Sequence, residues 1–186
     1  LGLGGEPATL LVAAPAYDVQ LLTPNEYSRP QLATEEIRGI VLHYTANPGT
    51  SAQNNRDYFE GLKDSHLTHA SSHFIVGLEG EVLQCIPLTE ISYASNTRNS
   101  DTVAIEVCHP DETGKFSAVT YDRVVELTAW LCREFRLDPE EDVIRHYDAT
   151  EKQCPLYYVE HPDAWAQLRA DVAAEMEAQA EAEKNS

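Results

Sequence analysis

The chain of 186 residues is long enough for one domain of ordinary size with a substantial hydrophobic core. Hydrophobic residues make up 42% of it and charged residues 24%, and no run approaches the roughly 18 apolar residues that a membrane span requires. Thirty-one acidic residues against thirteen basic ones give a formal net charge of −18. Such a surface disfavours binding to nucleic acid, whose phosphates are neutralised by Lys and Arg, and it equally disfavours anionic membranes.

The two ends of the chain differ in character from the part between them. Residues 1–17 contain a short apolar patch without the basic flank of a secretion signal, so we expect a flexible N-terminal segment and no visible targeting sequence. Residues 177–186 form an acidic C-terminal tail, which we expect to be a solvated helix end. The folded domain is therefore predicted to span residues 18–176.

The first half of that domain predicts strands around one helix. "IRGIVLHYTA" is almost continuously apolar and rich in β-branched residues, which indicates a buried central strand ending at His43. "NPGTS" follows, and Thr50 or Ser51 can cap a helix that runs to about Leu62. "SSHFIVG" and "EVLQCIP" lie on either side of residues 78–80, which predicts a hairpin with its glycine in the turn.

The second half adds another strand and a longer helix. "DTVAIEVCHP" alternates so that Glu106 faces the side of a strand opposite to Ile105. An amphipathic pattern predicts a helix from Thr120, its expected cap, to about Phe135.

The last elements of the domain complete a mixed α/β pattern. "DVIRHYD" is expected to be a short strand that continues into a loop, and Pro162 starts a final helix. That helix is expected to turn three apolar residues inward: Trp165, Leu168 and Val172. The sequence thus predicts a single α/β domain with a central mixed β-sheet flanked by helices.

Two histidines and one cysteine stand at strand ends or on loops, namely His43, His146 and Cys154. Taken singly, each of these residues is more often a core or surface residue than a ligand. Together, two imidazoles and a thiolate are a suitable set of three zinc ligands, which leaves a fourth position open for water. The remaining cysteines show no C-x-x-C pair and are predicted to be buried free thiols: Cys85, Cys108 and Cys132.

Four motifs carry a resemblance to a known family. With "VLHYTA", "SSHFIVG", "VAIEV" and "RHYDATEKQCP" in this order, the chain resembles the type 2 N-acetylmuramoyl-L-alanine amidases, a family of phage and bacterial wall enzymes that includes the peptidoglycan recognition proteins. The resemblance extends from about Asp18 to Met176. It implies an amidase-like α/β fold and a zinc-dependent hydrolase (Zn2+) that cuts the amide between N-acetylmuramic acid and L-alanine. It also implies peptidoglycan as the partner and an extracellular or cell-wall location, and it leaves open whether the source is bacterial or phage and which oligomeric state the protein adopts.

The resemblance assigns roles residue by residue. It implies that His43, His146 and Cys154 bind the zinc ion. It also implies that Lys152 reaches the substrate carbonyl and that Glu106 carries the proton in catalysis. Without the resemblance, Glu106 reads as a strand glutamate facing solvent and Lys152 as a surface lysine.

One position departs from part of the family. Some phage members have a tyrosine immediately before the hairpin histidine, where this chain has Ser72, and the difference shifts the expected catalytic burden onto Glu106. The roles of Ser72 and His73 stay open, since His73 is as well suited to orienting the hairpin by hydrogen bonds as to touching substrate.

Other polar residues have weaker assignments. The loop "SYASNTRNSD" offers three predicted contacts for the carboxylates of the stem peptide: Asn96, Arg98 and Asn99. Asp148 suits either a hydrogen bond to a ligand imidazole or a cap of its loop. Four histidines receive no role: His66, His69, His109 and His161, although His109 lies close enough to the Glu106 strand to line a cleft.

Two alternatives to an amidase remain. One is a peptidoglycan-binding module without activity, although such relatives typically lack the cysteine ligand. The other is a cysteine hydrolase in which Cys154 is the nucleophile and His146 or His43 is the base.

Overall fold

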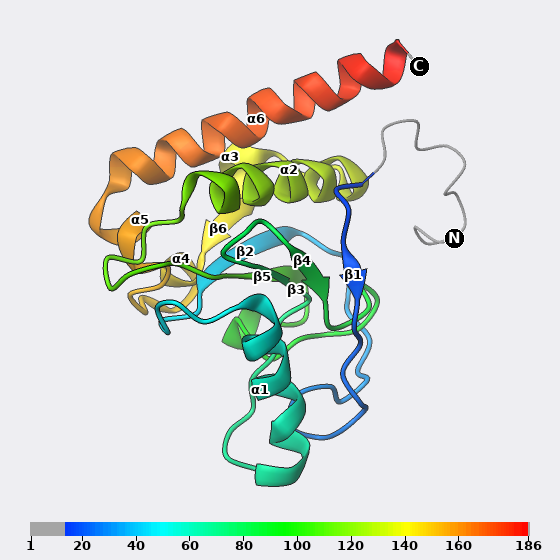
Figure 1. Cartoon of the computed structure of the whole chain (residues 1–186). Helices are drawn as coiled ribbons and strands as arrows, with labels where there is room; N and C mark the ends of the chain where they lie inside the picture. The colour runs from blue at the N-terminus through cyan, green and yellow to red at the C-terminus, as the bar shows by residue number, and fades with distance from the viewer. Residues whose placement is uncertain (1–13, 186) are drawn as a thin grey trace.

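A computed structural model describes residues 14–185, which form a six-stranded mixed sheet with helices on both faces (Figure 1). The strands are β1 (Asp18–Val19), β2 (Gly39–Tyr44), β3 (Phe74–Val76), β4 (Val82–Gln84), β5 (Thr102–Val107) and β6 (Val143–Arg145). Their order across the sheet is β1-β4-β3-β5-β2-β6, and every neighbouring pair is parallel except the β3–β4 hairpin. The predicted mixed α/β architecture is confirmed.

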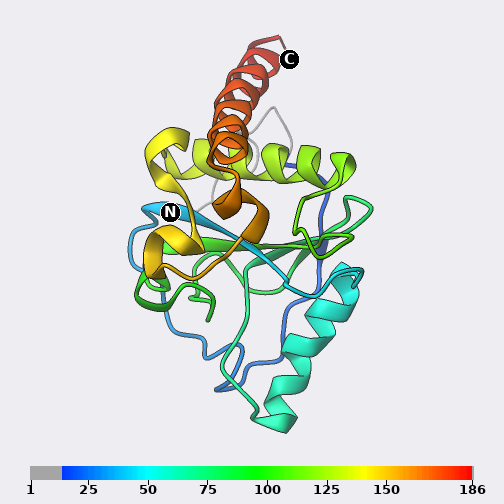
Figure 2. The same cartoon turned by 90° about the vertical axis from the view of Figure 1, so that its left-hand side faces the viewer.

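The helices lie in two layers. They are α1 (Ala52–Ser65), the 3-10 turn η3 (Asn96–Arg98), α2 (Ala118–Phe135), α3 (Pro139–Asp142), α4 (His146–Thr150), α5 (Leu156–Glu160) and α6 (Pro162–Lys184). Helix α2 lies over one face of the sheet with α6 packed on it, and α1 lies against the other face (Figures 1 and 2). Among residues 14–185, no helix is long and apolar enough to cross a membrane.

The central strands β2 and β5 are buried on both faces. Val103, Ile105 and Val107 belong to the main core under α2. On the opposite face, Cys108 packs in a smaller cluster with Ala52 and Phe59 of α1. Because successive side chains of a strand point to opposite faces, Glu106 projects toward the α1 side, as the alternation predicts. Burial on both faces explains why these strands read as apolar runs.

Helix α1 begins with a reciprocal cap. The Ser51 hydroxyl accepts a hydrogen bond from the Asn54 backbone N–H (3.0 Å), and the Asn54 side chain accepts one from the Ser51 N–H (3.1 Å). Of the two predicted caps, Ser51 is the one used. The helix runs to Ser65, three residues beyond the expected end, and stops where His66 adopts a left-handed conformation with φ of 55°.

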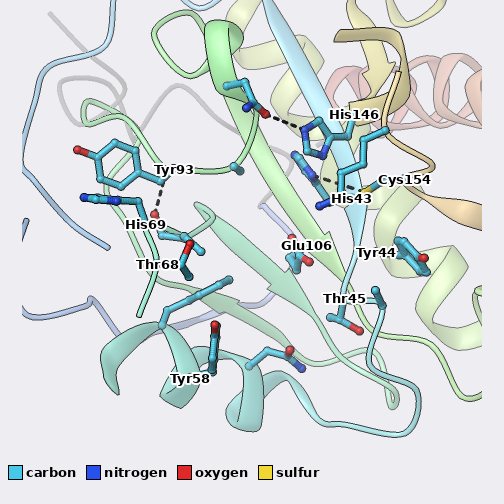
Figure 3. Close-up of a pocket in the computed structure, with 18 of the residues that line it drawn as sticks. His43, Tyr44, Thr45, Tyr58, Thr68, His69, Tyr93, Glu106, His146 and Cys154 are labelled. Carbon is cyan, nitrogen blue, oxygen red and sulfur yellow. Dashed lines mark hydrogen bonds between the residues drawn. The ribbon is translucent and has the colours of Figure 1, made fainter. Parts of the chain in front are cut away.

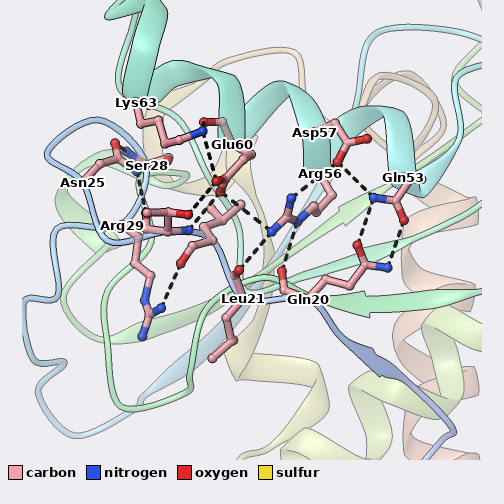
Figure 4. Close-up of polar contacts among 12 residues, drawn as sticks. Gln20, Leu21, Asn25, Ser28, Arg29, Gln53, Arg56, Asp57, Glu60 and Lys63 are labelled. Atoms are coloured by element: carbon pink, nitrogen blue, oxygen red, sulfur yellow. Dashed lines mark hydrogen bonds and ion pairs between the residues drawn. The ribbon is translucent and has the colours of Figure 1, made fainter.

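A polar network fastens α1 to the segment around β1 (Figure 4). The Arg56 guanidinium donates to the carbonyl oxygens of Gln20 (3.1 Å) and Leu21 (2.9 Å). One turn later, the Glu60 carboxylate accepts from both the backbone N–H and the hydroxyl of Thr23. These contacts hold the N-terminal part of the described chain against the helix that forms one wall of the cavity described below.

The predicted cap of α2 is wrong. The helix begins at Ala118 after Ser117, and Thr120 lies inside its first turn. The buried Thr120 hydroxyl donates instead to the Gly77 carbonyl at the end of β3 (2.7 Å), so it ties the helix to the hairpin. That hairpin is confirmed, with Gly80 at φ of 83° in its turn, a conformation that glycine adopts without strain.

Helix α6 is longer than its apolar stripe. The predicted inward residues are all buried: Trp165, Leu168 and Val172. The helix continues to Lys184 and packs on α2, where the buried Gln179 donates to the Glu126 carbonyl (3.2 Å). Residues 177–184 are thus helical, and the boundary at residue 176 stays a prediction. Most of the N-terminal segment that we expect to be flexible, residues 1–13, lies outside the described residues.

Candidate active site

The three predicted metal ligands meet at one edge of the sheet. His43 is the fifth residue of β2, and His146 follows directly after β6, which is the parallel neighbour of β2. Cys154 lies on the loop between α4 and α5, which is closed by a hydrogen bond from the Tyr147 N–H to the Cys154 carbonyl (2.9 Å). Because parallel strands end at the same edge, residues far apart in sequence come together there. The structure therefore brings all three side chains together.

The geometry of this cluster suits a metal ion. The candidate ligand atoms of His43, His146 and Cys154 all lie within 4.8 Å of one another, and the Cys154 Sγ is 3.8 Å from the His43 Nδ1. Tetrahedral zinc with ordinary Zn–S and Zn–N bond lengths separates S and N by about 3.6 Å. All three side chains are buried, at 6% exposure or less.

The protonation states of the two histidines also favour metal binding. The pKa of His43 is held well below its usual value, mainly by burial and also by the nearby His146 and Lys152. The pKa of His146 is lowered by burial and by the charge of Lys152. Both imidazoles are therefore neutral, the form that binds metals. Among the described residues, the buried His146 Nδ1 has no hydrogen-bond partner, which leaves its lone pair available to a cation. These residues fit a zinc ion.

Glu106 lies beside the cluster on β5. It is the register partner of His43 in the parallel β2–β5 pair, so the two side chains project from the same face of the sheet. The carboxyl group is half-buried, and burial raises its pKa to about 8 although the charge of Lys152 opposes that shift. Lys152 is exposed at the rim of the same cavity, and it forms no ion pair within residues 14–185.

A cavity of about 570 Å³ connects these groups (Figure 3). His43, His146 and Cys154 gather on one side of it, and Glu106 lies near its centre. Three aromatic side chains line the part of the cavity away from the metal ligands: Tyr58, His69 and Tyr93. The cavity is therefore a mixed polar and aromatic cleft with the candidate metal ligands at one end.

The sequence alone did not indicate that these aromatic residues line a cavity. His69 received no role, yet its ring stacks on Tyr27 (centroids 4.9 Å apart) and meets Tyr93 edge-on (5.4 Å). Tyr58 projects from α1 and remains 49% exposed. An exposed aromatic on the polar face of a predicted helix was the one signal that could have pointed to Tyr58.

The loop before β5 is placed only partly as expected. Asn96 and Asn99 line the cavity, whereas Arg98 lies outside its lining and pairs with Asp101 (2.8 Å). Contacts of these three residues with a stem peptide stay predictions. Asp148 forms a two-point pair with Arg145 and accepts from the Arg145 backbone N–H, which favours the capping alternative.

His73 is fully buried and lies outside the cavity lining. The Ala104 N–H donates to its Nδ1 (3.0 Å), and its Nε2–H donates to the Glu90 carbonyl (2.7 Å). These bonds favour the orienting alternative for His73. The Ser72 hydroxyl is also buried and donates to the Phe74 carbonyl (3.0 Å).

Known proteins resemble this chain in sequence and in fold. A family model described as N-acetylmuramoyl-L-alanine amidase matches residues 33–156. The N-acetylmuramoyl-L-alanine amidase BlyA of Bacillus subtilis (strain 168) is 33% identical over 172 residues, covering 82% of this chain and 45% of the relative. The N-acetylmuramoyl-L-alanine amidase CwlL of Bacillus licheniformis is 35% identical over 148 residues, covering 73% of this chain and 40% of the relative.

A solved structure gives the same fold. The catalytic domain of XlyA superposes with a TM-score of 0.71 at 23% identity, covering 85% of this chain and 99% of that one. The chain spans less than half the length of the two curated relatives. Since the family model matches more than half of the chain, and since its matched segment carries both histidines and the cysteine of the candidate metal centre, the chain belongs to the N-acetylmuramoyl-L-alanine amidase family.

Proposed function

We propose that this protein is a zinc-dependent N-acetylmuramoyl-L-alanine amidase that hydrolyses the bond between N-acetylmuramic acid and the L-alanine of the peptidoglycan stem peptide. Family membership supports the reaction class. The observation that carries the proposal is the convergence of two buried imidazoles and a buried thiol on one end of a cavity that also contains a carboxyl group.

Zinc is the proposed metal because two neutral nitrogens and one sulfur are the donors that zinc prefers over harder cations. His43, His146 and Cys154 would hold the ion. When bound there, zinc would polarise the substrate carbonyl and lower the pKa of a water molecule from ~15.7 toward ~7.

Glu106 is the proposed general base. Its carboxyl group takes the proton of the attacking water and passes it to the departing alanine nitrogen. Without a bound metal ion the pKa of Glu106 is raised to about 8, close to the range in which one group can serve as both base and acid, and a metal ion beside it would bring that pKa down. The half-buried position on β5 keeps the carboxyl within the cavity and limits its contact with bulk water.

Lys152 is the proposed oxyanion partner. Its side chain lines the cavity two residues before Cys154 and has no carboxylate partner in the described part of the chain, so its ammonium group can meet the negative charge that develops on the carbonyl oxygen. Removing one such donor typically costs about 10²–10³-fold in turnover.

The proposed activity also implies where the protein acts and which residues form the catalytic unit. A peptidoglycan substrate puts the site of action at the cell wall, and the net charge of −18 disfavours recruitment by bulk attraction to an anionic wall polymer. We further propose that residues 18–176 are the catalytic unit, flanked by the segments 1–17 and 177–186.

A cysteine hydrolase is disfavoured. Burial and the nearby Glu106 raise the pKa of the Cys154 thiol to about 12, whereas a nucleophilic cysteine requires a lowered pKa. A buried thiol of this kind becomes a thiolate when a cation binds beside it, which is the role proposed above.

The deciding experiment incubates the zinc-loaded protein with a muramyl tripeptide and analyses the products by mass spectrometry. Release of intact N-acetylmuramic acid together with a tripeptide beginning at L-alanine is the expected result, and a zinc chelator should abolish it. Intact substrate in the presence of confirmed bound zinc would favour a recognition module. Turnover that survives the chelator would remove the metal from the mechanism.

A further inference from the structure

In both candidate histidine ligands, the ring nitrogen that faces away from the candidate metal position contacts a polar side chain of the loop before β5. The His43 Nε2 lies 3.0 Å from the Ser95 Oγ, and the His146 Nε2 lies 3.0 Å from the Asn96 Oδ1. Two consecutive residues of the loop before β5 therefore engage the outer nitrogens of both rings. Neither residue carries a charge, and the Ser95 side chain is buried.

The opposite nitrogens point to the candidate metal position. The His43 Nδ1 is the ring atom 3.8 Å from the Cys154 Sγ. The His146 Nδ1 is the buried nitrogen that lacks a hydrogen-bond partner among the described residues. In both rings, then, Nδ1 is the nitrogen left for a cation and Nε2 is the nitrogen held by the loop.

We propose that Ser95 and Asn96 form a clamp that holds both histidines as Nε2-protonated tautomers and so presents two Nδ1 lone pairs to the metal. The Asn96 carboxamide oxygen can only accept a hydrogen bond, which requires a proton on the His146 Nε2. The Ser95 hydroxyl can accept or donate, and it accepts from the His43 Nε2 when a cation occupies the His43 Nδ1. The clamp rests on the proposed zinc site, and it commits the Asn96 Oδ1 to a positioning role in place of a contact with the stem peptide.

The loop is built to keep these acceptors in place. The Asn99 Oδ1 accepts hydrogen bonds from the backbone N–H groups of Ser95 (2.6 Å) and Ala94 (3.2 Å). The Thr102 hydroxyl donates to the Arg98 carbonyl (2.6 Å), and Arg98 pairs with Asp101. These bonds tie the turn η3 to the start of β5, the strand that is paired with β2.

Asn96 adopts a left-handed backbone conformation with φ of 54°. Asparagine, aspartate and glycine accept this conformation far better than other residues. The position can therefore be varied in side-chain chemistry without imposing backbone strain, which allows a matched set of variants.

A clamp of this kind contributes to metal affinity. When a cation takes the Nδ1 lone pair, the imidazole becomes a stronger donor at Nε2, so an acceptor there stabilises the bound form more than the free form. Loss of such a partner typically weakens metal binding by about 10–100-fold.

The test measures zinc affinity by competition with a chromophoric chelator. Asn96→Gly keeps the backbone conformation and removes the acceptor, and it is expected to bind zinc about 10–100-fold more weakly than the wild type. Asn96→Asp keeps the acceptor and is expected to bind zinc at least as tightly as the wild type. The control Gln31→Gly, at a remote left-handed position with φ of 60°, should leave the affinity unchanged. Ser95→Ala and Ser95→Thr repeat the comparison for His43.

A second readout reports the tautomers directly. In long-range ¹H–¹⁵N spectra of the zinc-loaded wild type, both ligand imidazoles should carry their proton on Nε2. Protons on Nδ1, or equal zinc affinity in Asn96→Gly and the wild type, would overturn the clamp and leave the proposed zinc enzyme intact. A wild-type protein that binds no zinc would overturn the proposed function itself, and the clamp with it.

Discussion

Glu106 lies in the cavity beside the candidate metal ligands, and burial perturbs its pKa. The carboxyl group is held on a central strand, and the low polarity around it outweighs the attraction of Lys152, so its pKa rises to about 8. A glutamate held on a central strand in this way is costly for the fold, and carboxyl groups with strongly perturbed pKa values cluster at functional sites, which supports the role proposed for it.

Replacing this carboxyl group should separate catalysis from folding. Glu106→Gln keeps the size of the side chain and removes its ability to exchange a proton, so we expect turnover of a muramyl tripeptide to fall by about 10²–10⁴-fold. Zinc content should stay close to that of the wild type, and the midpoint of urea unfolding should be equal or higher, because the neutral amide removes the cost of burying a carboxyl group with a raised pKa. A variant with wild-type turnover would show that another group carries the proton.

His73 gives a prediction about acid stability. Burial lowers its pKa to about 4, whereas an unfolded histidine titrates near 6.5. Between these values the unfolded chain binds a proton that the folded chain does not, so the folded state loses stability as the pH falls from 6.5 to 4, and the loss levels off below 4. The shift corresponds to about 3 kcal/mol.

The measurement compares the free energy of unfolding of the wild type and His73→Gln at several pH values. Glutamine retains a donor and an acceptor but does not titrate, so the difference between the two proteins should shrink by about 3 kcal/mol from pH 7 to pH 4. Two parallel curves would mean that His73 is protonated in the folded state, which would contradict the neutral form indicated by its bond from the Ala104 N–H.

At the scale of elements, Arg56 makes a central part of the contact between α1 and the segment around β1. The Arg56 guanidinium donates hydrogen bonds to the backbone carbonyls of Gln20 and Leu21, and its side chain is only 16% exposed. Arg56→Met should lower the free energy of unfolding by about 1–3 kcal/mol, because it removes hydrogen bonds from a charged donor. Amide hydrogen exchange in residues 18–23 should speed up at the same time.

Arg38→Met is the matched control for that variant. Arg38 forms an ion pair with Glu36 in which both side chains are more than two-thirds exposed, and such pairs contribute between about 0 and 1 kcal/mol. If the two variants lose equal stability, the backbone contacts of Arg56 do not anchor the N-terminal segment.

Most elements were predictable because their local pattern agrees with their final environment. The alternation around Glu106, the hairpin with Gly80 and the inward face of α6 are all confirmed. Thr120 failed as a cap because the acceptor of its hydroxyl is Gly77, 43 positions away, and no local pattern reveals that contact. The end of α6 packs through Gln179, a polar residue that carries no apolar signal.

At the scale of the whole molecule, the site depends on the order of the strands. His43 and His146 are 103 positions apart in sequence and meet because β2 and β6 pair in parallel, a register that the sequence alone does not specify. The candidate ligand set could be proposed from the family resemblance and from its position at predicted strand ends or on loops. Ser95 and Tyr93 could not, since an irregular loop places Ser95 beside His43 and Tyr93 at the cavity, and its residues carry no periodic signal.

Metal binding should stabilise the whole fold. The three ligands come from segments that are separate in the unfolded chain, so zinc binds the folded state preferentially and adds RT ln(1 + [Zn]/Kd) to its stability. At a free zinc concentration 100 times Kd, the free energy of unfolding should rise by about 2.7 kcal/mol. Urea titrations with zinc and with a chelator measure that difference.

Cys154→Ser provides the control for that measurement, because a surface with a net charge of −18 also attracts divalent cations without any specific site. Serine keeps the size of the side chain but is a poor zinc ligand, so the stabilisation should largely disappear although the surface charge is unchanged. If the variant gained as much stability from zinc as the wild type, the ion would be acting elsewhere on the acidic surface, and Cys154 would not be one of its ligands.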